Sequence, residues 1–291
     1  MDYANGAMSY IMGPGLIPQL LLTIVAMLVL YSVITVVETI VMTIKKFTNQ
    51  TTTLFDDTTA IKQTIPQGGD SALVYPQVYN SENERNGMEF SYSTWIFVNP
   101  DTFEKTVSDT CGGSNSKDTT RLKHIFHKGA VGCFPVMAPG VFVHGDKNTL
   151  RIYMNSVIHW DSYVEVPNVP IGKWFHLVLI QKGSSFDIFI NGNIAVRHQF
   201  DAVPKLNNGN IYIMAPVKFP ENPADRNIIT DFKVDQAMNG MVSRLKYFAY
   251  ALNYAQIDSL YREGPSKKIV NRSAFSQTPP YFYDDWWVTK Y

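Results

Sequence analysis

Asp187, Phe189 and Asn191 alternate along one stretch, as the oxygen ligands of a calcium ion can do. A calcium ion needs several oxygen ligands, however. Ser185 stands where a second carboxylate would be required. Asn191 precedes Gly192 and is better explained as a turn residue, because both types tolerate a positive φ. Asp187 and Asn191 therefore remain weak metal candidates, and we expect no cofactor.

The histidines and cysteines give no clear sign of a zinc site or of a disulfide framework. Of six histidines, only His124 and His127 have a zinc-like spacing, and on a strand they would point to opposite faces. We therefore expect no zinc site. Cys111 and Cys133 cannot form a framework of several disulfides. A single bridge between them stays open if their two loops adjoin, and two free thiols are the other interpretation.

Catalytic patterns are equally sparse. Glycoside hydrolysis uses two carboxylates on one face, whereas Asp101 and Glu104 follow Pro100 in a loop and Glu165 has no neighbouring acid. No spacing favours a Ser-His-Asp or Cys-His arrangement, and no glycine-rich loop could cradle a phosphate. Trp160 could stack on a sugar ring, although a partly buried position in the core is the other interpretation. We expect a protein that is not an enzyme.

The elements that would position these residues are strands. The stretch from Gly172 to Phe200 contains two apolar runs separated by Asn191-Gly192, the strongest short-range hairpin signal. This stretch therefore predicts three consecutive antiparallel strands, over Trp174–Gln181, Phe186–Ile190 and Ile194–Val196. They predict the centre of an all-β sandwich. A short helix over Tyr254–Glu263, capped by Asn253, should follow the last strand.

The composition of the chain argues against a nucleic-acid partner. Hydrophobic residues make up 45% of the 291 residues and charged residues 17%, and the formal net charge is zero. A nucleic-acid-binding protein usually carries a basic patch. We therefore expect no nucleic-acid partner.

The apolar run from Gln19 to Ile44 is long enough to span a bilayer. It has no basic start or small-residue cleavage site of a signal peptide, so we expect a retained anchor. Leu20, Leu30 and Val37 represent its lipid-facing side chains, and Glu38 is expected near the headgroups. Lys45 and Lys46 follow the span, which by the positive-inside rule keeps the bulk of the chain on the cytoplasmic face. Glycosylation of the sequons at Asn49 or Asn271 would argue for the opposite orientation.

The predicted organisation has five parts: a short N-terminal segment (1–18), a transmembrane helix (19–44), an extended linker (45–87), a β-sandwich (88–265) and a C-terminal tail (266–291). The tail ends with aromatic residues that are unusual at a solvated terminus. Packing on the parent domain and docking into a partner both remain open, because aromatic anchors are typical of binding hot spots. These residues are Tyr281, Phe282, Tyr283, Trp286, Trp287 and Tyr291.

An ordered set of segments carries a resemblance. After a first strand FSYSTWIFVNP come HIFHKG, GVFVHGDKNTLRIYMN, the GKWFH strand with its DIFING hairpin, GNIYIMAP and a closing strand and helix. In this order they resemble the laminin-G-like or concanavalin-A-like jelly roll. The resemblance implies an antiparallel jelly-roll β-sandwich, preceded here by a transmembrane helix and closed by one short helix. Fold resemblance alone says little about function.

The combination of one span, a cytoplasm-facing sandwich and an aromatic tail resembles membrane-anchored minor capsid proteins of large icosahedral DNA viruses with an internal membrane. That resemblance implies a non-enzymatic structural protein of the virion that links the membrane to the capsid shell. Its expected partners are the lipid bilayer and neighbouring capsid or other structural proteins. The alternative is a membrane-tethered lectin that binds glycans, and a glycoside hydrolase is a further, weaker one.

Overall fold

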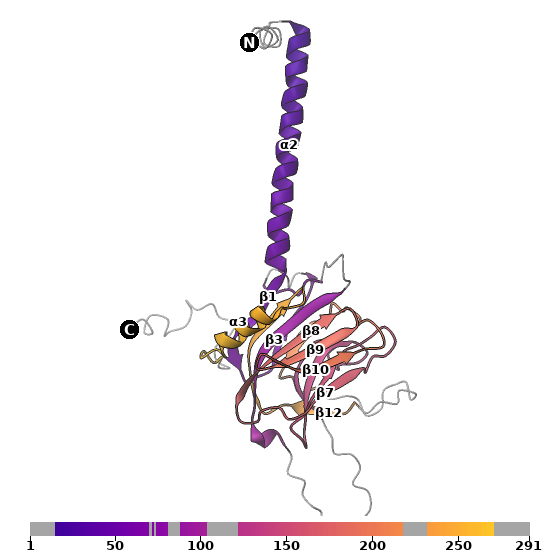
Figure 1. Cartoon of the computed structure of the whole chain (residues 1–291), viewed down its shortest axis with the longest axis vertical. Coiled ribbons are helices and arrows are strands. Elements are labelled where there is room, and N and C mark those ends of the chain that lie inside the picture. Colours follow the sequence, from indigo (N-terminus) through magenta and orange to yellow (C-terminus); the bar gives the residue numbers. More distant parts are fainter. Residues whose placement is uncertain are drawn as a thin grey trace, which may run out of the picture. The chain divides into compact units, whose positions relative to one another are not determined.

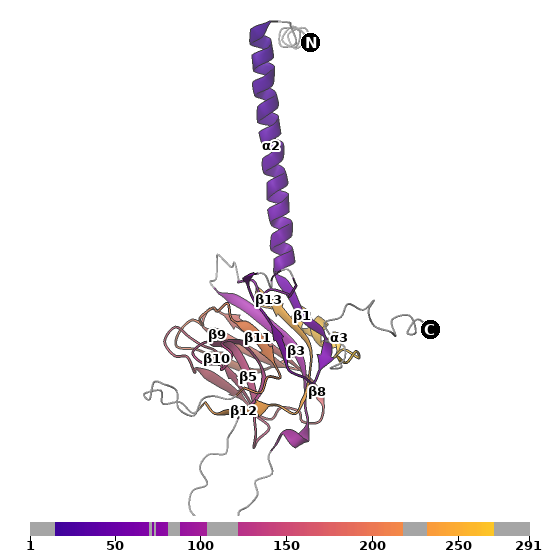
Figure 2. The same cartoon turned by 180° about the vertical axis from the view of Figure 1, so that it is seen from behind.

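The computed structural model describes residues 15–69, 72, 74–80, 88–103, 122–217 and 232–270. It confirms the expected fold class, an all-β sandwich with one apolar N-terminal helix and one short C-terminal helix (Figures 1 and 2). The chain forms two compact units, residues 1–50 and residues 51–291.

The first unit contains the helix α2 (Leu16–Asn49). Its stretch Gln19–Met42 has a mean hydropathy of 2.7 and is long and apolar enough to cross a membrane, a test that a signal sequence would also meet. Leu20, Leu30 and Val37 are exposed, as lipid-facing side chains would be. Glu38 is also exposed on this helix, and Lys45 and Lys46 belong to α2 although their side chains lie outside the described set.

The second unit is built from two antiparallel sheets. The first sheet has the strand order β1-β13-β3-β8-β9-β10 and the second has the order β2-β11-β4-β5-β6-β7, with β12 pairing in parallel with β4. The bounds are β1 (Thr51–Thr59), β2 (Gln63–Ile65), β3 (Glu89–Val98), β4 (Leu122–Gly129), β5 (Met137–His144), β6 (Leu150–Tyr153), β7 (Tyr163–Val166), β8 (Trp174–Lys182), β9 (Ser185–Ile190), β10 (Asn193–Gln199), β11 (Asn210–Ile213), β12 (Val234–Ala237) and β13 (Gly240–Phe248). A 3-10 turn spans Pro100–Thr102.

The main core lies between the two sheets and is lined by alternate side chains of their facing strands, among them Ile96, Phe175 and Ile152. Both outer faces are also covered. The helix α3 (Tyr254–Glu263) lies on the first sheet, where Ile257 packs with Val178 of β8 (Figure 1). On the second sheet an aromatic cluster around Phe142 and Phe232 includes the partly buried Trp160, as a core tryptophan would be.

The predicted hairpin is present, because β9 and β10 are joined at Asn191-Gly192 with φ values of 51° and 80°. The predicted helix is present with the predicted bounds. Its N-cap Asn253 accepts a hydrogen bond from the main-chain N–H of Gln256, whose side chain accepts one from the N–H of Asn253. This capping box satisfies two amide groups that the first turn would otherwise leave open.

Residues 45–87, expected to be an extended linker, include two strands of the sandwich. The first residues of this range continue α2 to Asn49, and β1 and β2 then form edge strands of the two sheets. In β1 the hydroxyl of Thr58 donates to the main-chain oxygen of Ser266 at 2.7 Å and accepts a hydrogen bond from the hydroxyl of Ser243 at 2.9 Å. Hydroxyl groups make these contacts, so the strand lacks the apolar alternation by which strands are found in a sequence.

Candidate functional site

The two calcium candidates are engaged within the protein. Asp187 lies on β9 opposite Arg197 of β10, whose Nε and Nη2 donate to its two carboxylate oxygens at 2.7 and 2.9 Å. Asn191 Oδ1 accepts a hydrogen bond from the main-chain N–H of His176 at 2.9 Å. Its side chain thus supports the turn. Within the described ranges, no group of three or more His, Cys, Asp or Glu side chains could hold a metal ion.

The prediction that His124 and His127 point to opposite faces is wrong. Their Nε2 and Nδ1 atoms lie 2.7 Å apart, and both side chains are buried. The reason is a β-bulge, because the register between β4 and β5 shifts between His124 and Phe126. One extra residue on a strand reverses the alternation of the side chains that follow it.

The hydrogen bonds of this pair fix its protons. His124 Nδ1 accepts from the N–H of Ala215 at 3.1 Å, so its proton is on Nε2 and is donated to His127 Nδ1. His127 Nε2–H in turn donates to the carbonyl of Ala130 at 2.8 Å. Burial lowers the pKa of both rings, for His127 to about 4, and for His124 the neighbouring ring adds to the effect. Both Nδ1 lone pairs are occupied, so the pair is not a ready zinc site.

A second pair of polar side chains, Ser93 and His176, is not indicated by any spacing in the sequence. Ser93 Oγ and His176 Nε2 lie 2.8 Å apart, on neighbouring strands β3 and β8. This resembles a nucleophile and its base. However, both side chains are buried, and Tyr261 of α3 stacks on Trp95 beside the imidazole ring. Burial lowers the pKa of His176 to about 4, and its Nδ1 has no hydrogen-bond partner in the described structure to orient it, unlike the base of a catalytic triad.

Glu165 is held by three cationic or donor groups. It accepts from Arg151 Nη2 at 2.7 Å and from His144 Nε2 at 3.0 Å, and Lys147 Nζ lies 3.5 Å away. Partial burial acts to raise the pKa of Glu165, but the hydrogen bond and charge of Arg151 and the charge of Lys147 lower it overall. The carboxylate therefore stays ionised near neutral pH, whereas a general acid needs a raised pKa.

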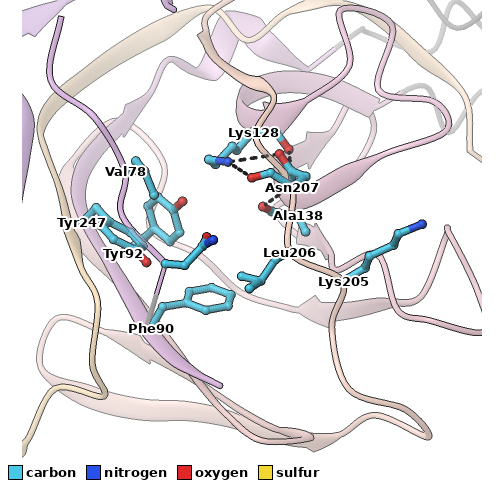
Figure 3. A pocket seen from close by; sticks show the side chains of 10 residues that line it. Val78, Phe90, Tyr92, Lys128, Ala138, Lys205, Leu206, Asn207 and Tyr247 are labelled. Carbon is cyan, nitrogen blue, oxygen red and sulfur yellow. Dashed lines mark hydrogen bonds between the residues drawn. The ribbon is translucent and has the colours of Figure 1, made fainter. Parts of the chain in front are cut away.

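A pocket opens between the two sheets and has about 300 Å³ of free space, including its mouth (Figure 3). One side is formed by the rings of Phe90 and Tyr92 on β3 and Tyr247 on β13, and the opposite side by Lys128 of β4 and Asn207 of the β10–β11 loop. We call it the Lys128 pocket. The remaining lining residues are Val78, Asn80, Ala138, Lys205 and Leu206.

Lys128 and Asn207 hold each other in place. Lys128 Nζ donates to both the main-chain oxygen and the Oδ1 of Asn207, and Asn207 Nδ2 donates to the carbonyls of Ala138 and Lys128 at 3.2 and 3.4 Å. Burial lowers the pKa of Lys128 to about 8. Sequence spacing gives no signal for this site, because its residues come from six separate segments of the chain.

The structure describes only one of the remaining predicted site residues. Cys133 is buried, and burial raises the pKa of its thiol. Cys111 and the aromatic tail residues Tyr281, Phe282, Tyr283, Trp286, Trp287 and Tyr291 lie outside the described residues. The disulfide and the docking role of the tail therefore stay predictions.

Comparisons with known proteins found no matching family model and no matching curated protein. Solved structures do show a likeness. The botulinum neurotoxin serotype D binding domain has a TM-score of 0.43 at 11% identity, over 72% of this chain and 41% of its own. Domain 4 of an extracellular arabinanase from Geobacillus stearothermophilus, in complex with arabinotriose, has 0.38 at 16%, over 68% and 71%. The Trypanosoma rangeli sialidase has 0.40 at 11%, over 62% and 24%. Values this low carry no information on ligand or activity.

Proposed function

We propose that this protein is a membrane-anchored, non-enzymatic interaction protein, in which an apolar helix holds a β-sandwich at a bilayer. The observation that carries the proposal is the stretch Gln19–Met42 of α2. Its 24 residues extend about 36 Å at 1.5 Å each, against a hydrocarbon core of about 30 Å. Its large apolar side chains are exposed along the whole stretch, and lipid is the solvent that suits them.

The contacts of the candidate catalytic groups support a binding role over a chemical one. Asp187 is paired with Arg197, and Glu165 is surrounded by donors that keep it ionised. Ser93 and His176 are covered by α3 and have no opening to a substrate. A nucleophile needs access and an oriented base, and the Ser93 pair has neither.

We propose the cytoplasmic side for the sandwich, because Lys45 and Lys46 follow the span and no basic residue precedes it. On that side the partners would be the proteins of a viral capsid that encloses a membrane, and the chain would be a minor capsid protein that links the two. The support is the order of its parts, a span, a sandwich and a tail with six aromatic residues among its last eleven. Aromatic side chains of this kind supply most of the binding energy in many interfaces.

A membrane-tethered lectin is the second candidate, and one observation favours it. The Lys128 pocket combines aromatic rings with an amine and an amide, and small-ligand sites commonly combine apolar walls with a few polar groups. A glycan array probed with the full-length protein in detergent, with and without calcium, tests this candidate. Binding of defined glycans would favour the lectin, and an empty array would remove its support.

The anchor is tested by expressing the full chain and a variant lacking residues 19–42 with a C-terminal epitope. The full chain should stay in the membrane pellet after alkaline carbonate extraction, and the deletion variant should be released. Protease added to sealed microsomes should remove the epitope if the sandwich is cytoplasmic and spare it if the sandwich is luminal. Release of the full chain by carbonate, or recovery of a mature chain trimmed ahead of residue 45, would contradict the anchor.

The partners are tested in virus-infected or producing cells by crosslinking before membranes are solubilised. Stoichiometric capsid proteins in the crosslinked complex support the capsid role. Recovery of the protein with lipid alone, from particles that contain a shell, would contradict it.

A further inference from the structure

The most unusual group of the sandwich is the ammonium of Lys128. Its side chain is 6% exposed, and no described Asp or Glu carboxylate lies within 4 Å of Nζ. Its acceptors in the described structure are two oxygens of one residue, Asn207. An ammonium has three N–H donors, so the third is left for another acceptor. Buried charges are normally paired, because removing them from water is costly.

The rest of the pocket fits an anion. Its lining contains a second lysine, Lys205, and no acidic residue. The hydroxyl of Tyr92, which is 2% exposed, makes no hydrogen bond to another described group, whereas that of Tyr247 donates to the carbonyl of Tyr79 at 2.7 Å. The pocket therefore offers an ammonium donor and a phenol donor that its own walls do not use (Figure 3).

The shape limits the ligand further. The pocket is narrow, and its free space of about 300 Å³ includes open solvent. A small charged group can thus enter while a larger body stays outside. Leu206, which is 42% exposed, gives an apolar surface on which a ring can lie, and the buried Phe90 lies beside it (Figure 3).

We propose that the Lys128 pocket is a binding site for a carboxylate carried on a ring, with the carboxylate on the Lys128 ammonium and the Tyr92 hydroxyl and the ring against the exposed side chain of Leu206. A carboxylate fits better than a phosphate, because the interior is narrow and presents few donors. The inference depends neither on the anchor nor on the tail. A carboxylate on a ring can come from an aromatic acid or from a sugar acid, and the probes below separate these sources.

The test uses the full-length protein in detergent micelles and isothermal titration calorimetry with benzoate and with glucuronate. Benzamide and glucose are the neutral matches, and inorganic phosphate is the competing anion. Binding of benzoate alone identifies an aromatic acid, and binding of glucuronate alone identifies a sugar acid. The neutral matches should bind at least tenfold more weakly. Phosphate binding tighter than both carboxylates, or no binding by either acid, would overturn the proposal.

Two variants assign the binding to Lys128. Lys128→Met should weaken binding at pH 7 at least tenfold, and Lys205→Met should weaken it less.

The pH dependence of binding is a second test, which does not require a substitution. It is needed because Lys128 also holds Asn207, so that its replacement could disturb the loop. Raising the pH from 7 to 9.5 should weaken binding to the wild type about thirtyfold, since the amine loses its proton near pH 8. In Lys128→Arg the guanidinium keeps its charge, and binding should not change with pH. Binding to the wild type that does not change over this range would contradict the assignment.

Discussion

His124 Nε2 donates a hydrogen bond of 2.7 Å to His127 Nδ1, three residues later on the same strand. Two facts follow from this contact. The strand must contain a bulge, since an unbroken strand would separate the two side chains by its full thickness. Both rings must also be neutral, because a proton on either Nδ1 would face an N–H donor, from Ala215 or from His124.

The first prediction concerns acid. An unfolded histidine takes up a proton near pH 6.5, whereas His127 and His176 stay neutral to about pH 4 in the fold. Between these values the unfolded chain binds more protons, so the free energy of unfolding falls as the pH falls. The loss should be on the order of 1 kcal/mol per pH unit for each buried histidine. Urea unfolding of the full chain in detergent at pH 7.5, 6 and 4.5 measures it.

The matched variants separate this effect from general acid sensitivity. His127→Phe should lower stability at pH 7.5 but reduce the slope with pH, because one titrating group is lost. Replacing the exposed His159 by Gln should leave the slope unchanged. Equal slopes in all three proteins would show that the buried rings do not control acid unfolding.

The second prediction concerns the hairpin turn. Asn191 has a φ of 51° and accepts a hydrogen bond from the His176 N–H. Asn191→Gly keeps access to this φ and loses the bond, at a cost of about 1 kcal/mol. Asn191→Ala also adds backbone strain and should cost about 1 kcal/mol more. Thermal unfolding measures both, and an alanine variant as stable as the glycine variant would disprove the role of φ.

The third prediction concerns calcium. Because Arg197 occupies both carboxylate oxygens of Asp187, millimolar calcium or its removal by EDTA should not change the melting temperature. Asp187→Asn should cost less than about 1 kcal/mol, since Arg197 is largely exposed. A calcium-dependent rise in melting temperature that disappears in Asp187→Asn would contradict this prediction and support a calcium site at Asp187.

The fourth prediction concerns the aromatic tail. Deleting Tyr281–Tyr291 should leave the melting temperature unchanged within about 1 °C and impair assembly with the protein partners. Replacing Trp286 and Trp287 by Ser is the finer variant, because hot-spot aromatic residues commonly contribute about 2 kcal/mol or more each. Particle yield and crosslinked partners are the measurements. Normal assembly without the tail would exclude docking, and a large fall in melting temperature would favour packing on the parent domain.

Local signals in the sequence were sufficient for much of the fold. Asn191-Gly192 predicted the hairpin and Asn253 the start of α3, because a turn and a cap depend on a few adjacent residues. The edge strand β1 was missed, because Thr58 makes its contacts through a hydroxyl and the strand has no apolar alternation. The bulge after His124 cannot be predicted from the sequence of β4 alone, because it depends on how β4 pairs with β5.

The candidate site could not be predicted for a related reason. Lys128 and Tyr92 meet across two different sheets, and Asn207 comes from a loop far along the chain. No spacing in the sequence connects such residues, and a lysine on a strand is expected in solvent. The closure of the sandwich decides that this one is buried.

The first strand of the sandwich depends on the last residues that the structure describes. β1 pairs with β13, and Thr58 exchanges main-chain hydrogen bonds of 2.8 Å with Lys268 and Val270. A ribosome releases α2 and β1 long before these partners exist. The apolar helix can therefore enter a bilayer while β1 is still unpaired, and the sheet closes only when translation has passed residue 270. With α2 as the proposed anchor, the sandwich would complete its folding at the membrane surface, after insertion.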